Sequence, residues 1–347
     1  MRVGVRAENP AERVAMAAGL APEAFFEVYG ALMMARTVMA GLQLGVFDAL
    51  AAQELDAPGL AERLGHDERG LDVLLVALHA QGYLERRDGR YRPSVRTKRT
   101  LLRDAKRPVR EWMGFSYDMW EAFSGLEEAI RTGEPQGLHD KDPDDPYWER
   151  YMRGLFELSQ LGGGDVARAI GAKKPRRLLD LAGGHGGFAM ALCDRHPELQ
   201  ATILELEGAA RIGRRIVQEQ GYAERISFSV GDLFEAELGT GFDVVTAHNI
   251  LHHFPPAENV DLLRRARGAL APGGTVAALE LERPEGDDRG SQLGALTGVL
   301  FYVTSRARTY GAGELEGFFM EAGFERVRSK HLLRVPGCVL TRGEAPA

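Results

Sequence analysis

The stretch Arg177-Leu-Leu-Asp-Leu-Ala-Gly-Gly-His-Gly-Gly-Phe-Ala-Met-Ala-Leu192 decides the fold of this chain. It begins with a short apolar run, typical of a central parallel strand. The glycines after it allow a tight turn and the close approach of a ligand, and the following apolar residues begin an amphipathic helix. This order is typical of a site for a nucleoside-type cofactor. From this stretch alone, a turn without a ligand and a dinucleotide fingerprint, which Gly184-His-Gly-Gly-Phe-Ala189 also fits, both stay open.

Acidic residues follow the first three strands that the sequence predicts. Asp180 ends the first strand, Glu205 lies in the second, Ala201–Leu206, and Asp232 follows the third, Ile226–Val230. Glu205 comes 19 residues after Gly186, about where a ribose-binding acid belongs. A fourth strand is expected over 242–248. Open α/β sheets bind ligands at the carboxyl ends of their strands, so these acids indicate one site.

Together these motifs resemble the class I S-adenosylmethionine-dependent methyltransferases. The resemblance is to the small-molecule O-methyltransferase family, which includes caffeate, chalcone and hydroxyindole methyltransferases and bacterial natural-product tailoring enzymes. It covers the chain from about Ala31 onward, and Asp180-Leu-Ala-Gly-Gly-His-Gly186 matches the family's Asp-x-Gly-Gly-Gly-x-Gly, with Ala182 in place of the first glycine.

The resemblance implies that the chain uses S-adenosylmethionine, releases S-adenosylhomocysteine and needs no metal. Glu205 matches the family's ribose-binding acid, and Asp232 matches its adenine-binding acid, with Leu233 and Phe234 flanking the ring. The cofactor-binding residues expected in full are Asp180, Gly183, Gly184, Gly186, Glu205, Leu206, Asp232, Leu233, Phe234, His248 and Asn249.

His252 is the candidate general base. A phenol has a pKa of about 10 and histidine one of about 6.5, so an imidazole can accept the proton of a hydroxyl acceptor near neutral pH. His252 follows the fourth strand and matches the family's base. Glu280, in a fifth strand predicted over Thr275–Glu282, matches the acid beside that base. The alternatives are a helix-start histidine bonded to backbone and a solvated carboxylate at a strand end.

A second acid of the plant enzymes aligns with Ala307, which has no carboxylate. This departure keeps other chemistry open. The enzyme could rely on alignment alone, methylate carbon, nitrogen or a more acidic hydroxyl, or use the cofactor for a reaction other than methylation.

The N-terminal part predicts a winged helix. Leu60–Gly65 and Gly70–Leu78 form a helix-turn-helix pattern, and Tyr83–Arg92 reads as a hairpin with Asp88-Gly89 at its turn. The preceding segment, Ala31–Gly45, is apolar on most faces and must be buried in a core or against a partner. The resemblance implies that this domain forms a homodimer and that its first helices line the partner's substrate pocket.

DNA binding is the competing function for a winged helix. Between Arg86 and Arg110 there are 11 Lys or Arg and only 2 Asp or Glu. The second helix of the pattern, however, carries mostly Leu and Val, which cannot read base edges. The net charge of −7 also argues against a general nucleic-acid binder.

The predicted organisation is a winged-helix dimerisation domain at 1–105, a helical linker at 106–165 and a Rossmann-like cofactor domain at 166–347. A mostly parallel seven-stranded sheet is expected, closed by a helix at Gly313–Gly323 and two mutually antiparallel strands at Phe324–Leu333 and Pro336–Arg342. The loop Gly133–Pro146 is a candidate lid. The residues expected to line an apolar acceptor pocket are Trp112, Phe115, Trp120, Tyr151, Met152, Phe156, His253, Phe301 and Tyr302.

Composition places the chain among cytoplasmic enzymes. Its 347 residues suffice for two domains, and we find no apolar run long enough to span a membrane. The first 18 residues lack the apolar core of a signal peptide. Two cysteines are too few for a disulfide framework, and no cysteine or histidine cluster has zinc-site spacing. The sequence thus predicts O-methylation of a small aromatic metabolite.

Overall fold

A computed structural model of the chain describes residues 4–135, 137–284, 291–305 and 308–347. Ala307, which aligns with the second acid of the plant enzymes, lies outside the described residues. The chain divides into two compact units, Arg2–Tyr117 and Asp118–Ala347. The predicted linker helices group with the second unit from Asp118 onward, and the three-part division of the chain stays a prediction.

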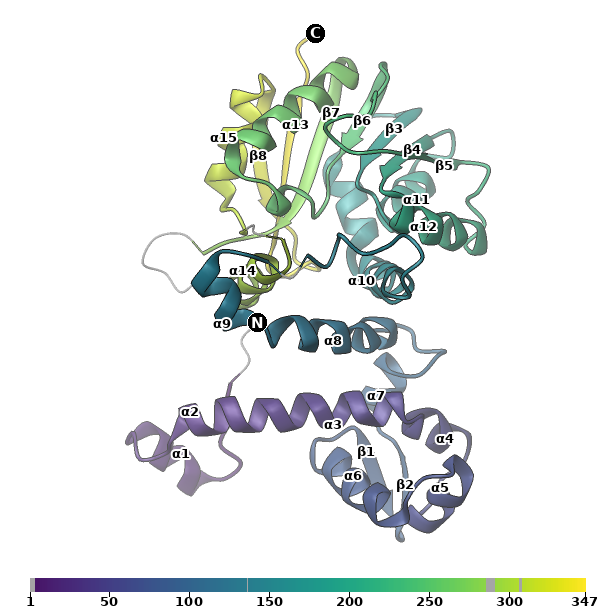
Figure 1. Cartoon of the computed structure of the whole chain (residues 1–347), viewed down its shortest axis with the longest axis vertical. Coiled ribbons are helices and arrows are strands. Elements are labelled where there is room, and N and C mark those ends of the chain that lie inside the picture. The colour runs from purple at the N-terminus through teal and green to yellow at the C-terminus, as the bar shows by residue number, and fades with distance from the viewer. Residues whose placement is uncertain (1–3, 136, 285–290, 306–307) are drawn as a thin grey trace. The chain divides into compact units, whose positions relative to one another are not determined.

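The first unit is helical apart from one hairpin (Figure 1). Its elements are α1 (Pro10–Ala17), α2 (Glu23–Phe25), η1 (Phe26–Gly30), α3 (Ala31–Gln43), α4 (Val46–Ala52), α5 (Ala57–Leu64), α6 (Glu68–Ala80), β1 (Leu84–Arg87), β2 (Arg90–Pro93), α7 (Val95–Thr100) and the first part of α8 (Arg110–Phe123).

The predicted winged-helix pattern is present as α5, α6 and the β1–β2 hairpin. Asp88 and Gly89 both have positive φ, 48° and 80°, as a two-residue hairpin turn requires. On α6, Leu71, Leu75 and Leu78 share one face and are at most 2% exposed. This face packs into the core of the unit and is not available to read DNA.

The helical stretch Glu23–Gln43 presents an unusually apolar surface. By length and composition alone it could cross a membrane, and only 17% of an apolar 18-residue window in it is buried. This finding corrects the expectation that no run is long enough, because the helix continues past charged residues that interrupt the apolar run in the sequence. Its large apolar side chains that are exposed are Phe25, Phe26, Val28, Tyr29, Leu32, Met33 and Met34.

The second unit is an α/β domain around one seven-stranded sheet (Figure 1). Its strands are β3 (Arg177–Leu181), β4 (Gln200–Glu205), β5 (Ile226–Val230), β6 (Phe242–Thr246), β7 (Leu270–Leu281), β8 (Glu325–His331) and β9 (Cys338–Glu344). Its helices, beyond the end of α8, are α9 (Leu126–Thr132), α10 (Tyr147–Ile170), α11 (Gly187–Arg195), α12 (Glu207–Glu219), η2 (Leu251–His253), α13 (Pro256–Ala269), α14 (Gln292–Ser305) and α15 (Ala312–Glu321).

The strand order is β5-β4-β3-β6-β7-β9-β8. The five strands from β5 to β7 are parallel, β9 runs antiparallel to β7, and β8 and β9 are antiparallel to each other, as predicted. The chain order reverses between β3 and β6, which places a ligand crevice at their carboxyl ends. The predicted fold class is confirmed.

Candidate active site

The glycine turn follows β3 at this point of reversal. Gly184 and Gly186 have φ of +48° and +73°, which glycine adopts without strain. A Cβ at Gly183 would collide with the Asp180 carboxylate, so the turn can pack on that side chain only because glycine is present. Ala182, the departure from the family motif, has φ of +52° and therefore holds a conformation that favours glycine.

Two carboxylates hold the turn in place, one of them buried and the other partly buried. Asp180 is 1% exposed and accepts a hydrogen bond from the Thr246 hydroxyl (2.6 Å). Glu205 accepts the backbone N–H groups of Gly184 (2.9 Å) and Leu206 (2.8 Å). Burial raises the pKa of Asp180 to about 7 and that of Glu205 to about 7. The structure thus places Asp180 beneath the turn and Glu205 beside it.

The predicted adenine-binding residues form a second turn after β5. Asp232 is exposed, and one of its carboxylate oxygens accepts the backbone N–H of Phe234 (2.7 Å). Leu233 is buried, whereas Leu206 at the end of β4 is 43% exposed. An exposed carboxylate near exposed apolar surface fits the amino group and ring of an adenine.

His248 carries a buried donor that has no partner. The backbone N–H of Leu279 donates to its Nδ1 (3.0 Å), so the ring proton is on Nε2. That Nε2 is buried and has no hydrogen-bond partner among the described residues. Burial lowers the pKa of His248 to about 3, which keeps the ring neutral. Asn249 follows with φ of +54°. These features, with the glycine turn, fit a nucleoside-type cofactor that supplies the missing acceptor.

His252 and Glu280 form a buried pair. Nδ1 of His252 lies 2.8 Å from one carboxylate oxygen of Glu280, and the other oxygen accepts the N–H groups of Ile250 (2.9 Å) and Leu251 (2.8 Å). The side chains are only 3% and 1% exposed, so Glu280 is not the solvated carboxylate left open by the sequence. When Glu280 is ionised it accepts a hydrogen bond from the Nδ1–H of His252, and the lone pair of the ring then lies on Nε2.

Burial also sets the charge of this pair. It lowers the pKa of His252, and the nearby His139 adds to this effect, so the imidazole is neutral near pH 7. Burial raises the pKa of Glu280, although the backbone N–H groups of Leu251, Ile250 and His252 oppose this. Phe301 covers one side of the His252 ring, at 3.6 Å between ring centroids and 6° between planes.

Several further predicted pocket residues gather near this pair. The His253 ring lies 4.3 Å from that of His252. Met152 is buried against the glycine turn, where a Cβ on Gly184 would lie 3.2 Å from its sulfur. Tyr151 lies 5.4 Å from His139, a residue of the predicted lid that the sequence analysis did not assign to the site. The ring of Trp148, one of the large residues that the sequence places between the two domains, lies 6.4 Å from that of His139. Only tertiary contacts reveal the position of His139.

The remaining predicted pocket residues lie in several parts of the chain. Trp112 and Phe115 belong to the first unit, and their part in an acceptor pocket stays a prediction. In the second unit, Trp120 is 37% exposed, and the Tyr302 hydroxyl lies beside Gly133. Phe156 lines a different cleft.

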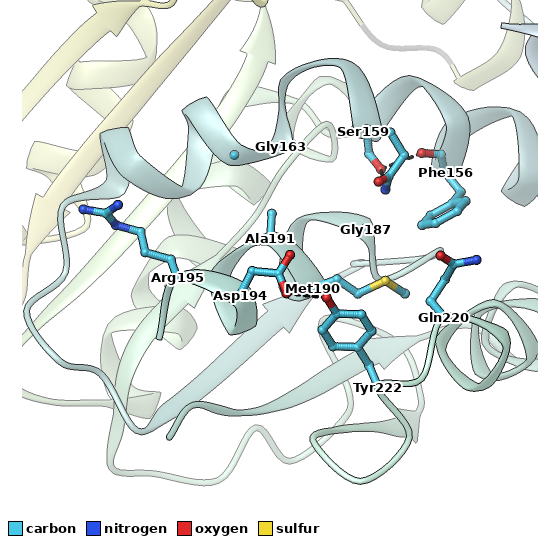
Figure 2. A pocket seen from close by; sticks show the side chains of 12 residues that line it. Phe156, Ser159, Gly163, Gly187, Met190, Ala191, Asp194, Arg195, Gln220 and Tyr222 are labelled. Carbon is cyan, nitrogen blue, oxygen red and sulfur yellow. Dashed lines mark hydrogen bonds between the residues drawn. The ribbon is translucent and has the colours of Figure 1, made fainter. Parts of the chain in front are cut away.

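The cleft that Phe156 lines lies between α10 and α11 and has a volume of about 440 Å³ (Figure 2). Asp194, Arg195, Gln220 and Tyr222 give it a polar lining, and the hydroxyl of Tyr222 donates to Asp194. The predicted cofactor residues are not among those that line it. Within the described ranges, no group of three or more His, Cys, Asp or Glu is arranged to hold a metal ion.

The parallel sheet, the glycine turn and the acids at the strand ends define a cofactor-dependent α/β enzyme. A family model described as an O-methyltransferase domain matches residues 124–325, and one described as an O-methyltransferase dimerisation domain matches residues 26–101. The chain belongs to the S-adenosylmethionine-dependent O-methyltransferase family. Members similar to it include bacterial natural-product enzymes.

Three similar proteins illustrate the range of this family. The chain is 31% identical to "3-hydroxy-5-methyl-1-naphthoate 3-O-methyltransferase" of Streptomyces sahachiroi, over 86% of this chain and 88% of that protein. It is 30% identical to "L-tyrosine C(3)-methyltransferase" of Streptomyces lavendulae, over 82% of each. The solved structure described as "PigF with SAH" is 27% identical, with a TM-score of 0.79 over 97% of this chain and 99% of that one.

Proposed function

We propose that this enzyme transfers a methyl group from S-adenosylmethionine to a hydroxyl of a small aromatic metabolite, with His252 as general base. The observation that carries the proposal is the buried His252–Glu280 pair, which directs a neutral Nε2 away from the carboxylate. Family membership supports the reaction, and the aromatic residues around the pair support an aromatic acceptor.

The residues at the strand ends supply the cofactor contacts in this proposal. Glu205 holds the ribose hydroxyls, Asp232 holds the adenine amino group, and the Nε2–H of His248 donates to an acceptor atom of the cofactor. When bound, S-adenosylmethionine supplies an electrophilic methyl group. Most of the rate then comes from alignment of the acceptor oxygen and from exclusion of water.

In this proposal His252 acts on the acceptor and not on the cofactor. Nε2 of His252 accepts the hydroxyl proton while the oxygen attacks, and Glu280 stabilises the imidazolium that forms. Glu280 also fixes the orientation of the ring because its second oxygen is held by two backbone N–H groups.

The first unit, in this proposal, joins two copies of the chain into a homodimer. The match to a dimerisation domain supports this role, and the exposed apolar side chains between Phe25 and Met34 supply the surface. Burial of these side chains against a second copy removes them from water, which a monomer cannot do.

Carbon methylation is the second candidate. A relative named for methylation of a tyrosine carbon is 30% identical to this chain, and Ala307 stands where the plant enzymes have a second acid. The mass and fragmentation of the product distinguish transfer to carbon, nitrogen or oxygen, and would also reveal a reaction that transfers no methyl group.

Titration calorimetry with S-adenosylmethionine, S-adenosylhomocysteine and NAD is the first test. We expect both sulfur nucleosides to bind and NAD not to bind. Binding of neither sulfur nucleoside would overturn the proposal, because the glycine turn would then be structural only.

A further inference from the structure

We propose that His139, together with His253, contacts the acceptor and binds an oxygen that lies next to the hydroxyl to be methylated. The inference rests on the proposed function and deepens it, since it names the class of acceptor. That class is an aromatic compound with two neighbouring oxygens, either a vicinal diphenol or a hydroxyl beside a carbonyl.

The imidazole rings of His252, His253 and His139 lie next to one another in that order, beginning at the proposed base. The ring of His253 lies 4.3 Å from that of His252, and the ring of His139 lies 4.9 Å from that of His253 at an angle of 79°. His139 comes from the loop between α9 and α10, whereas the other two rings come from η2. A segment remote in sequence therefore brings a polar ring to the base.

The hydrogen-bonding capacity of the two outer rings is unused. Among the described residues, neither the imidazole of His139 nor that of His253 makes a hydrogen bond, whereas His252 is bound to Glu280. Both rings are only partly exposed. His139 lies beside the rings of Tyr151 and Trp148, and His253 lies beside that of Phe301. In the part of the chain that the structure describes, neither ring has a fully buried nitrogen without a partner, so both can meet water, and an oxygen of a ligand can replace that water.

Packing of the loop does not account for His139. The loop is held by the Trp148 indole N–H, which donates to the carbonyl of Asp142 (3.0 Å), and by Arg211, which donates to the carbonyl of Pro143 (2.9 Å). Neither hydrogen bond uses the imidazole of His139, whose ring lies 6.4 Å from that of Trp148. Replacement of His139 is therefore expected to leave the loop in place.

The charge state of the rings indicates the kind of oxygen. Burial lowers the pKa of His139 to about 4 and holds that of His253 well below its ordinary value, so both rings are neutral near pH 7. A neutral imidazole offers one donor and one acceptor, which together match a hydroxyl. A carboxylate would be better served by charged rings, whereas burial, His252 and His139 all oppose protonation of His253.

The test is calorimetric binding of 2,3-dihydroxynaphthalene and 2-naphthol to the full chain saturated with S-adenosylhomocysteine. The wild type is expected to bind the diol about tenfold more tightly, which is the effect of one well-placed hydrogen bond. His139→Phe should bring this ratio close to one, and His139→Asn, which keeps a donor and an acceptor, should restore part of it. His66→Phe, an exposed histidine of the first unit, is the matched control.

The outcomes separate this inference from the proposed function. An unchanged ratio in His139→Phe overturns the role of His139. Failure of both naphthols to bind, while S-adenosylhomocysteine binds, overturns the proposed acceptor class and leaves the cofactor assignment intact. Failure of S-adenosylhomocysteine to bind overturns the proposed function itself.

Discussion

At the scale of single residues, the site depends on side chains that water cannot reach. His252 and Glu280 are both nearly fully buried, and so is Asp180 beneath the glycine turn. Removal from water keeps the imidazole neutral and raises the pKa of each carboxyl group. Both effects can be tested by substitution.

His252→Ala removes the proposed base. We expect kcat to fall by about 10²–10⁴-fold, as general-base catalysis predicts, while S-adenosylmethionine binds within twofold of its wild-type affinity. Initial rates by product mass spectrometry and calorimetry measure the two quantities. An unchanged kcat would show that another group, or alignment alone, removes the proton.

Asp180→Asn isolates the effect of one buried carboxyl group on stability. The pKa of Asp180 rises from 3.8 to about 7 in the folded chain, so between these values the folded state binds one more proton than the unfolded state. The wild type therefore loses stability as pH rises through this window, by about 1.4 kcal/mol per pH unit from this group. Asp180→Asn has no carboxyl group at this position and lacks this loss. The free energy of unfolding of the variant minus that of the wild type should therefore increase with pH.

Urea unfolding at pH 4.5, 5.5 and 6.5 measures that difference. The amide can still accept the hydrogen bond from Thr246, so the comparison leaves the turn intact. A difference that stays constant with pH would mean that Asp180 titrates normally.

Sequence could predict the residues whose roles follow from a motif, but not those brought in by a loop. The glycine turn, Glu205 and His252 stand at fixed places after predicted strands. His139 lies in a loop and has no such periodicity, and Ala182 gave no sign in the sequence that its φ would be positive. Whether Glu280 was solvated or paired also depended on tertiary packing.

At the scale of elements, the glycine turn is held between β3, β4 and α12. Gly213, in α12, approaches the carbonyl of Gly184 so closely that a Cβ there would collide with it, and the Phe228 ring would lie 2.8 Å away. The strand-and-helix pattern was predictable because buried strands and amphipathic helices have a period. This close approach between two elements was not.

Gly213→Ala should destabilise the fold by about 1–3 kcal/mol, the usual cost of overpacking, and weaken cofactor binding because the turn must shift. Gly164→Ala in α10 is the matched control, since nothing lies within 4 Å of its Cβ, and it should stabilise by up to about 1 kcal/mol. Thermal unfolding and calorimetry measure both. Equal behaviour of the two variants would contradict the role of the contact.

At the scale of the whole molecule, the first unit exposes an apolar helical surface that a second copy can cover. Val28 and Leu32 are 74% and 46% exposed, and both lie on this stretch. The sequence predicted that the overlapping segment Ala31–Gly45 is buried in a core or against a partner, because it is apolar on most faces. It could not show which faces the unit itself leaves uncovered.

The double variant Val28→Glu, Leu32→Glu should weaken dimerisation at least tenfold, because two charges would be buried in the interface. Sedimentation velocity at micromolar concentration measures the mass, and circular dichroism checks the fold. Val73→Glu, at a site on α6 that is 70% exposed, should remain dimeric. A wild type that sediments as a monomer would refute the homodimer.

The stacking of Phe301 on His252 gives the enzyme an intrinsic spectroscopic reporter. At 3.6 Å and 6° between planes, the imidazole lies within the shielding cone of the benzene ring. The ring current should therefore move the carbon-bound proton resonances of His252 upfield from their usual positions in a proton NMR spectrum, and Phe301→Leu should return them. An acceptor that enters beside the base and tilts either ring would change these resonances. Binding of the acceptor could therefore be followed at His252 without any isotope label.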